Sequence, residues 1–429
     1  MLFQDITILD ENLDVREHMY VGTKAERIAY IGTEMPEEDF GEIYPGDGRL
    51  LMSGFYNAHA HSPMALMRGY GENLALQDWL NTRIFPFEDK LTGEAVYWGT
   101  MLCMAESLRF GIVSSSDMYY FCGDMARAVV ECGAKANISR SLVTFDDTDI
   151  WDLDRFLEAR DFLRDWNGAG GGRVVAEMSL HAEYTNQEKA ARQVAEFTRE
   201  SGARMHVHIS ETKSEHEECK ARRNGRTPIQ FFDSLGLLDQ PVTAAHCVWV
   251  DDEDIAIMAE KGVTVSSCPA SNMKLASGVC NAPKLLASGV NLAIGTDSVA
   301  SNNSLNFLEE LKLFALVQKV HHQDPTVITP KQALYAGTRA GALTQGREDC
   351  GLLRQGFRAD LIVLDIAQPH MHPVHNLLNN VIYSADGRDV VLTMVDGKVL
   401  YRGGDLLTID MEKTVAEVER ATQNILRQL

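Results

Sequence analysis

Two histidines, His59 and His61, stand two residues apart in the segment NAHAH, directly after an apolar run. Alternate residues of a strand point to the same side, so both imidazoles would face one way. Neutral imidazole is a common ligand for Zn²⁺. A single histidine is more often a surface or core residue, so the pair gains meaning only if further ligands reach the same place.

Other residues that can bind a metal or move a proton occur where further apolar, β-branched runs end. They are His181, His208, Glu211, His246 and Asp297. Together with His59 and His61, His208 and Asp297 would offer a divalent cation three nitrogens and one oxygen, and would leave a position for water. An open position of this kind is typical of a catalytic metal site.

The chemistry of such a site would be hydrolysis. Zinc lowers the pKa of bound water from about 15.7 to about 7, which makes a nucleophile available at neutral pH. Glu211 comes three residues after His208, beyond the predicted strand, where it could protonate a leaving group or a ring nitrogen. His246 could orient the water by a hydrogen bond.

The remaining histidines lie in helical or loop segments or behind a predicted ligand, and we do not expect them to bind metal. Seven have no position at a strand end: His18, His216, His321, His322, His370, His372 and His375. His206 shares a strand face with His208, so it is predicted to point inward one layer deeper, as a packed residue.

The elements that must position these residues lie in the middle of the chain, over residues 51–352. Eight short β-branched runs occur there, and helical patterns such as residues 94–110 and 188–201 separate them. This alternation predicts an α/β fold, the (β/α)₈ barrel, in which active sites lie at the C-terminal ends of the strands. A doubly wound sheet also alternates, but no G-x-G-x-x-G turn follows the first strand.

The two ends of the chain have a different pattern. Alternating apolar and polar residues over 5–15, 27–35, 359–365 and 390–404 are typical of strands, and Asp396-Gly397 predicts a two-residue hairpin turn. We expect residues 1–50 and 353–429 to form one small β-sandwich domain beside the barrel.

Composition limits the partners and the compartment. The 429 residues include 40 basic and 61 acidic residues, a net charge of −21, which argues against binding to nucleic acid or to an anionic membrane. No apolar run approaches the ~18 residues of a membrane span, and no signal pattern begins the chain. The eight cysteines form no C-x-x-C pair, so reduced, buried thiols and a cytoplasmic location are predicted.

Four segments, taken in order, resemble those of the amidohydrolase superfamily. They are NAHAH at 57–61, HISE at 208–211, AAHC at 244–247 and GTDSVASNNSLN at 295–306. The resemblance is nearest to the branch of 5-methylthioadenosine/S-adenosylhomocysteine deaminases and related chlorohydrolases, and it runs nearly end to end. It implies a small-molecule substrate, a 6-aminopurine nucleoside that loses ammonia by hydrolysis.

The resemblance implies one metal ion, held by His59, His61, His208 and Asp297, because the fourth strand lacks the lysine of dinuclear members. Zinc is the usual occupant, and Fe²⁺ or Mn²⁺ would accept the same ligands. His246 and Asp297 would then handle the proton of the water, and Glu211 would protonate the ring nitrogen.

For the substrate, the resemblance implies that Glu88 of FPFED holds the ribose hydroxyls and that Arg140 and Arg155 meet the carboxylate of S-adenosylhomocysteine. His181, after the fourth strand, is a further expected substrate contact. One residue departs from the family pattern: Glu183 stands in HAEYT where members commonly have proline. This carboxylate could alter substrate preference or simply face solvent.

Several alternatives remain open at this stage. The same metal ligands would serve a deaminase of guanine, 8-oxoguanine, cytosine or a pterin, and also a triazine-type chlorohydrolase. A non-catalytic metal-binding protein is a remote alternative, since the ligands and Glu211 are all present. A homo-oligomer is a further possibility, by analogy with other barrels that carry an appended sheet.

Overall fold

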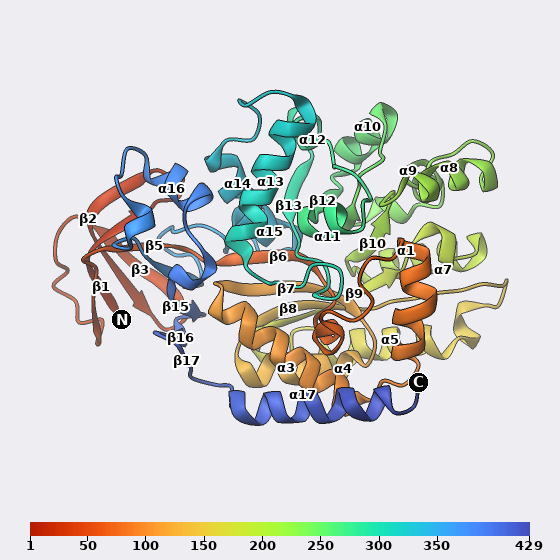
Figure 1. Cartoon of the computed structure of the whole chain (residues 1–429), viewed down its shortest axis with the longest axis horizontal. Coiled ribbons are helices and arrows are strands. Elements are labelled where there is room, and N and C mark those ends of the chain that lie inside the picture. The colour runs from red at the N-terminus through yellow and green to blue at the C-terminus, as the bar shows by residue number, and fades with distance from the viewer.

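The computed structural model describes residues 1–429 and contains a parallel barrel beside a separate mixed sheet (Figure 1). Eight parallel strands follow one another around the barrel in chain order, which confirms the predicted (β/α)₈ fold. They are β6 (Phe55–Ala60), β7 (Ile112–Tyr119), β8 (Lys135–Arg140), β9 (Val174–Leu180), β10 (Met205–Ile209), β11 (Val242–His246), β12 (Thr264–Ser267) and β13 (Asn291–Ile294).

The barrel closes between its first and last strands without a regular ladder. The backbone N–H of Asp297, just after β13, donates to the carbonyl of His59 on β6 at 3.0 Å. Asn57 adds side-chain bonds to Thr296, accepting from its N–H at 2.9 Å and donating to its hydroxyl at 2.7 Å. Gly295 fits this seam because a Cβ there would lie 2.7 Å from the Cβ of His59.

Helices surround the barrel. The two predicted at residues 94–110 and 188–201 are confirmed as α3 and α7. Two short helices, α1 (Leu76–Trp79) and α2 (Phe85–Glu88), follow β6. The later helices of the barrel region are α3 (Gly93–Arg109), α4 (Cys122–Cys132), α5 (Asp154–Trp166), α6 (Ala169–Gly172), α7 (Glu188–Ser201), α8 (Lys213–Arg222), α9 (Pro228–Ser234), α10 (Asp252–Lys261), α11 (Pro269–Lys274), α12 (Ala282–Ala287), α13 (Phe307–His322), α14 (Pro330–Gly337) and α15 (Arg339–Thr344). None of the helices is both long and apolar enough to cross a lipid bilayer.

The second sheet takes strands from both ends of the chain, as predicted, and its hydrogen bonds join nine strands into one mixed sheet. They are β1 (Leu2–Leu9), β2 (Val15–Lys24), β3 (Arg27–Gly32), β4 (Ile43–Pro45), β5 (Arg49–Ser53), β14 (Leu361–Asp365), β15 (Val390–Val395), β16 (Lys398–Arg402) and β17 (Asp405–Leu406). Asp396 and Gly397 both have positive φ, so the predicted two-residue hairpin turn joins β15 to β16.

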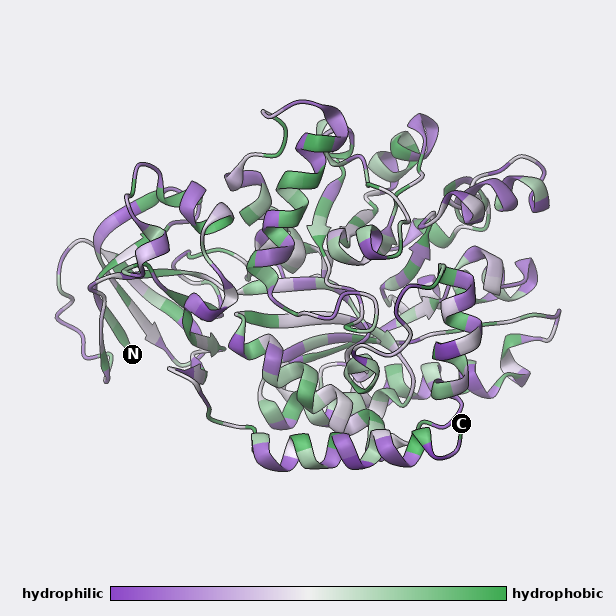
Figure 2. Ribbon diagram, viewed as in Figure 1, coloured by the Kyte–Doolittle hydropathy of each residue, from purple (hydrophilic) through white to green (hydrophobic).

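The expected boundary at residue 50 lies within strand β5. Strand β5 pairs with β14 as far as Ser53, so the sheet continues three residues past residue 50. The last helix, α17 (Met411–Leu426), leaves the sheet and packs along α3 of the barrel (Figure 1). Arg420 of α17 bonds Glu94 of α3 at 2.8 Å, and hydrophobic and hydrophilic residues alternate along the helix (Figure 2).

Buried charges join the sheet to the barrel. The ammonium of Lys135, at the start of β8, lies 2.6 Å from Asp360 and 2.7 Å from Asp396 of the predicted hairpin turn. Tyr56 on β6 donates a further hydrogen bond of 2.6 Å to Asp360. A buried ammonium needs such partners, because an unpaired charge in the interior is costly.

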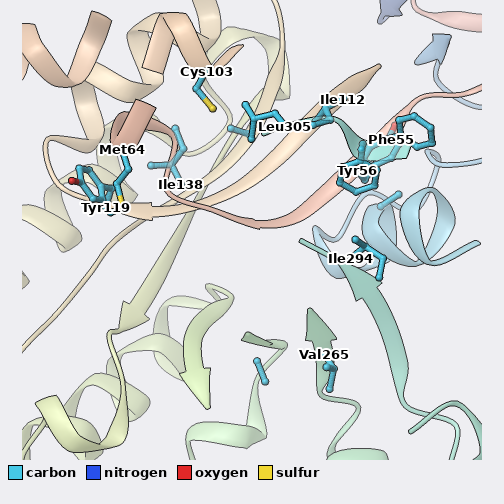
Figure 3. Packing of buried hydrophobic residues seen from close by; sticks show 14 of the residues in the cluster. Phe55, Tyr56, Met64, Cys103, Ile112, Tyr119, Ile138, Val265, Ile294 and Leu305 are labelled. Carbon is cyan, nitrogen blue, oxygen red and sulfur yellow. The ribbon is translucent and has the colours of Figure 1, made fainter. Parts of the chain in front are cut away.

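The largest hydrophobic cluster fills the space between the barrel strands and their helices. Its labelled members, such as Phe55, Ile112 and Ile294, come from several barrel strands, and Cys103 comes from α3 (Figure 3). A smaller cluster lies within the terminal sheet. The barrel core therefore supports the strand ends at which the polar residues gather.

Candidate metal centre and substrate pocket

Three histidines and one aspartate meet at the C-terminal ends of the barrel strands. Nε2 of His61 lies 3.4 Å from Nε2 of His208 and 3.4 Å from Oδ1 of Asp297. Nε2 of His59 lies 3.6 Å from the same oxygen. Atoms this close can contact a common ion. Two overlapping groups, which share His59, could each hold a metal: His59, His61 and His208, and His59, His246 and Asp297.

Two of the imidazoles are oriented by backbone carbonyls. Nδ1 of His61 donates to the carbonyl of Met118 at 2.6 Å, and Nδ1 of His208 donates to the carbonyl of His181 at 2.8 Å. These bonds place the proton on Nδ1 and leave the lone pair of Nε2 directed at the cluster. Outer hydrogen bonds of this kind fix both the tautomer and the ring orientation of metal-binding histidines.

His59 is oriented by another histidine. Its Nδ1 lies 2.9 Å from Nε2 of His206, which is fully buried behind it. The Nε2 of His59 is also buried and has no hydrogen-bond partner in the protein. Buried polar atoms normally find a partner, and an unpartnered nitrogen that faces two imidazoles and a carboxylate fits a divalent cation.

Asp297 is held rigidly by hydroxyl and amide donors. Its Oδ2 accepts from Ser271 at 2.5 Å and from Ser301 at 3.0 Å, and its Oδ1 accepts from the N–H of Ser298 at 2.7 Å. The backbone of Asp297 has a φ of +58°, a conformation that non-glycine residues adopt at a cost and that often marks functional sites. Ser298 and Ser301 follow Asp297 in the same loop, whereas Ser271 lies in α11, so spacing in the sequence gave no signal for Ser271.

Glu211 and His246 lie beside the cluster. Oε2 of Glu211 is 3.8 Å from Nε2 of His246, and Asn272 donates to Nδ1 of His246 at 3.1 Å, which places the imidazole proton on Nε2. Burial, together with the negative charge of Asp297, raises the pKa of Glu211 to about 8. Burial therefore favours the protonated form of Glu211, which is the form that can donate a proton.

A second buried glutamate, which we did not predict, supports Glu211 from below. Glu215 on α8 accepts the backbone N–H of Ser210 at 2.9 Å with one oxygen and the N–H of Glu211 at 2.7 Å with the other. The φ of Ser210 is +49°, so these bonds hold a strained turn between His208 and Glu211. The sequence offered one signal for this role: Glu215 follows Glu211 by four residues and stands near the start of a helix.

An inner pocket opens directly above the metal-binding cluster. Glu88 and His181 line it, as do apolar side chains of Trp79, Leu80 and Ile84. These apolar residues belong to a short helical segment formed by α1 (Leu76–Trp79), the single π turn η2 (Leu80–Ile84) and α2 (Phe85–Glu88). Burial raises the pKa of Glu88 to about 7 and lowers that of His181 to about 4.

The inner pocket continues into an outer chamber of about 970 Å³. Arg140 and Arg155 line this chamber, and Glu88 and His181 line both spaces. The structure thus places all the residues predicted for substrate binding around one continuous cavity. Its size is appropriate for a small organic ligand.

The expectations for Glu183 are wrong. Its side chain is fully buried and lines neither the pocket nor the chamber. Its two oxygens accept from Nε of Arg223 and Nη2 of Arg222, each at 2.6 Å. The reason is that the backbone at the end of β9 turns this side chain toward the C-terminal end of α8, where two arginines neutralise it.

This ion pair predicts a stability effect. We expect Arg223→Ala to lower the free energy of unfolding by about 2 to 3 kcal/mol, because Glu183 would keep only a half-exposed partner. Arg192→Ala, which breaks an exposed pair with Glu188, should cost about 0.5 kcal/mol or less. Urea unfolding followed by circular dichroism measures both, and equal losses would contradict the buried role of Glu183.

The model of the amidohydrolase family matches residues 50–400. The chain belongs to the amidohydrolase family. A 5-methylthioadenosine/S-adenosylhomocysteine deaminase of Dictyoglomus thermophilum is 38% identical over 427 residues, which cover 100% of this amidohydrolase and 99% of that relative. A protein of the same name from Desulforamulus reducens is 42% identical over 388 residues, which cover 90% of this chain and 88% of that relative.

Solved structures of similar shape include an adenosine deaminase from Xanthomonas campestris with bound zinc. It has a TM-score of 0.93 and 29% identity, over 100% of this amidohydrolase and 98% of that chain. The atrazine chlorohydrolase of Arthrobacter aurescens, solved with zinc, has a TM-score of 0.90 at 20% identity, over 98% and 99% of the two chains. The second likeness concerns the fold alone.

Proposed function

We propose that this amidohydrolase removes the amino group of a 6-aminopurine nucleoside by hydrolysis, with S-adenosylhomocysteine or 5-methylthioadenosine as the substrate. The observation that carries the proposal is the place of Glu211, a buried carboxyl with a raised pKa that lies beside His246 and lines the inner pocket. The names of relatives that match nearly the whole chain support this choice of substrate.

The metal that the site would hold is one divalent ion, bound by His59, His61, His208 and Asp297. Zinc suits three imidazole nitrogens and a carboxylate, and similar structures are solved with zinc. When bound, zinc supplies Lewis-acid activation of a water molecule near neutral pH. Fe²⁺ or Mn²⁺ would accept the same ligands.

The protein residues provide the proton transfers. Glu211 gives its proton to ring nitrogen N1, which makes C6 more electrophilic while the oxygen of water adds to it. His246 orients that water through the proton on Nε2, and Asp297 accepts the water proton. The C6–N6 bond then breaks as Asp297 passes its proton to the departing nitrogen. The C6 hydroxyl returns its proton to Glu211 as the C6 carbonyl forms, so ammonia and the inosyl product result.

The pocket supports binding of a nucleoside in the corresponding orientation. Glu88 lies at the boundary of the inner pocket and the outer chamber, where its carboxylate would hold the ribose hydroxyls. His181 lines the same boundary. Arg140 and Arg155 lie farther out, so a tail at the 5′ position of the ribose would extend toward them. The apolar segment of α1 and η2 would cover the purine and exclude water.

A panel of ring amines tests this proposal. Ammonia release should be fastest from S-adenosylhomocysteine or 5-methylthioadenosine, slower from adenosine, and lowest from guanine, 8-oxoguanine, cytosine and a pterin. Chloride release from a chlorotriazine should be equally low. A chelator should abolish it, and zinc should restore it. Faster turnover of guanine or of the chlorotriazine would assign a different substrate, and no turnover by the zinc-loaded protein would refute the enzymatic function.

Glu215→Gln should slow the reaction without removing the metal. An amide can accept only one of the two backbone N–H bonds that hold Ser210 and Glu211, so the proton donor should shift. We expect kcat to fall by about tenfold to a hundredfold, with KM changed much less. Steady-state kinetics and metal analysis measure this, and Glu218→Gln on the exposed face of α8 is the control. A change confined to KM would contradict a positioning role.

For cellular location and assembly, we propose what the sequence analysis predicts. All eight cysteines are free and buried, which suits a reducing cytoplasm. The partner is a small molecule, and the acidic surface argues against nucleic acid. A homo-oligomer stays a prediction by analogy, and analytical ultracentrifugation measures it.

A further inference from the structure

The outer chamber contains a pair of opposite charges on one helix face. Arg155 and Glu158 are three residues apart on α5, and both line the chamber. Residues at this spacing are neighbours on a helix surface. Arg140, at the end of β8, lies opposite them and donates from Nε to Oε2 of Glu158 at 2.7 Å.

The two arginines keep free hydrogen-bond donors. Arg140 uses Nε for Glu158 and Nη1 for the carbonyl of Ser141 at 2.6 Å, and its guanidinium stacks on Tyr120 at 4.7 Å. Its Nη2 has no partner in the protein. Arg155 bonds only the carbonyl of Val143, through Nη1 at 2.5 Å, and pairs with no carboxylate. A carboxylate on a bound ligand could therefore reach both guanidinium groups.

Glu158 adds an acceptor beside these donors. Its Oε2 is engaged by Arg140, whereas Oε1 makes no hydrogen bond, and the side chain is 60% exposed to the chamber and solvent. Six acidic residues line the chamber against two basic ones: Glu88, Asp89, Asp124, Glu158, Asp161 and Asp165 against Arg140 and Arg155. Of these, Asp124 pairs with Arg127, and Asp161 and Asp165 pair with Arg164, whereas Glu158 pairs with Arg140 of the chamber itself.

We propose that Glu158 binds the α-ammonium group of a zwitterionic amino-acid tail, while Arg140 and Arg155 bind the carboxylate on the same carbon. This inference rests on the proposed function and adds to it a residue that recognises the ammonium group of S-adenosylhomocysteine. The three side chains make the chamber a subsite for a zwitterion, because it offers both charges within one helix turn of each other. Glu158 is then a specificity-determining residue with no part in the chemistry at the purine.

Three substrates separate this role from others: S-adenosylhomocysteine, its analogue that keeps the carboxylate but lacks the α-amino group, and 5-methylthioadenosine, which has neither charge. We expect Glu158→Gln to raise the KM for S-adenosylhomocysteine by about threefold to fivefold, the range of an exposed ion pair. The KM for the des-amino analogue and kcat/KM for 5-methylthioadenosine should stay unchanged.

The matched control is Asp161→Asn. Asp161 lies one turn along α5, lines the same chamber and loses the same charge, but it pairs with Arg164 at 2.9 Å rather than with Arg140. It should change KM by less than about twofold.

If Glu158→Gln impairs the des-amino analogue as much as S-adenosylhomocysteine, Glu158 only positions Arg140, and the inference is refuted. Unchanged kinetics on all three substrates would refute it too. A wild-type protein that deaminates none of the three would refute the proposed function itself.

Discussion

Replacing Glu211 by glutamine should leave the metal bound and remove nearly all turnover. Glu211 lies beside the metal cluster and lines the pocket, burial raises its pKa to about 8, and glutamine cannot give up a proton to ring nitrogen N1. General acid catalysis contributes about 10² to 10⁴ in rate, so we expect kcat on 5-methylthioadenosine to fall by about a thousandfold. Stopped-time ammonia release and metal analysis by mass spectrometry measure both quantities.

Glu217→Gln is the control for this variant. Glu217 lies on the exposed face of α8, only six residues along the chain, and pairs with Lys220 away from the pocket. It should keep the wild-type rate. If Glu211→Gln turned over adenosine derivatives at the wild-type rate, Glu211 would not be the proton donor, and the mechanism would need another acid.

Asp297→Asn should have the second large effect, and it should act on metal binding as well as on rate. The carboxylate of Asp297 is the only anion among the four groups that meet at the cluster, and its Oδ1 lies 3.4 Å from His61 and 3.6 Å from His59. A neutral amide would bind a divalent cation more weakly and could not accept the proton of the water. We expect metal content below one ion per chain after dialysis, and a fall in turnover of more than about a hundredfold, beyond that typical of outer-shell changes.

Two control variants show how much of this effect comes from the carboxylate itself. Ser301→Ala removes one donor to Oδ2 of Asp297 but keeps the carboxylate, so it should cost about tenfold. Asp252→Asn changes an exposed residue that pairs with Lys284, and it should cost nothing. Stoichiometric zinc and wild-type turnover in Asp297→Asn would show that the ion is held elsewhere.

Local patterns predicted the elements of the fold well. The helical period over residues 94–110 and 188–201 agrees with α3 and α7 to within a residue, because both helices bury one face against the barrel. The pair Asp396-Gly397 predicted its hairpin because few residues accept the two positive φ angles that the turn requires. These features depend on neighbours in the chain, so the sequence alone contains them.

Features that depend on distant partners were missed. Glu183 looked like a pocket or surface charge, but Arg222 and Arg223, about 40 residues later, enclose it. In the sequence, helix α17 belongs to the C-terminal part of the small domain, yet it packs against α3 of the barrel. In each case the partner lies far along the chain, and only the packing of whole elements brings it near.

The sequence by itself determined which residue types stand at the strand ends, and hence the kind of ion and the kind of reaction that the chain can support. Only the tertiary structure decided which of these residues meet. It places the buried, unpartnered Nε2 of His59 opposite Asp297 where the barrel closes, and it places Glu158 against Arg140. The physical reason is that strand alternation fixes the side to which a residue points, whereas barrel closure and the docking of α5 fix what it meets there.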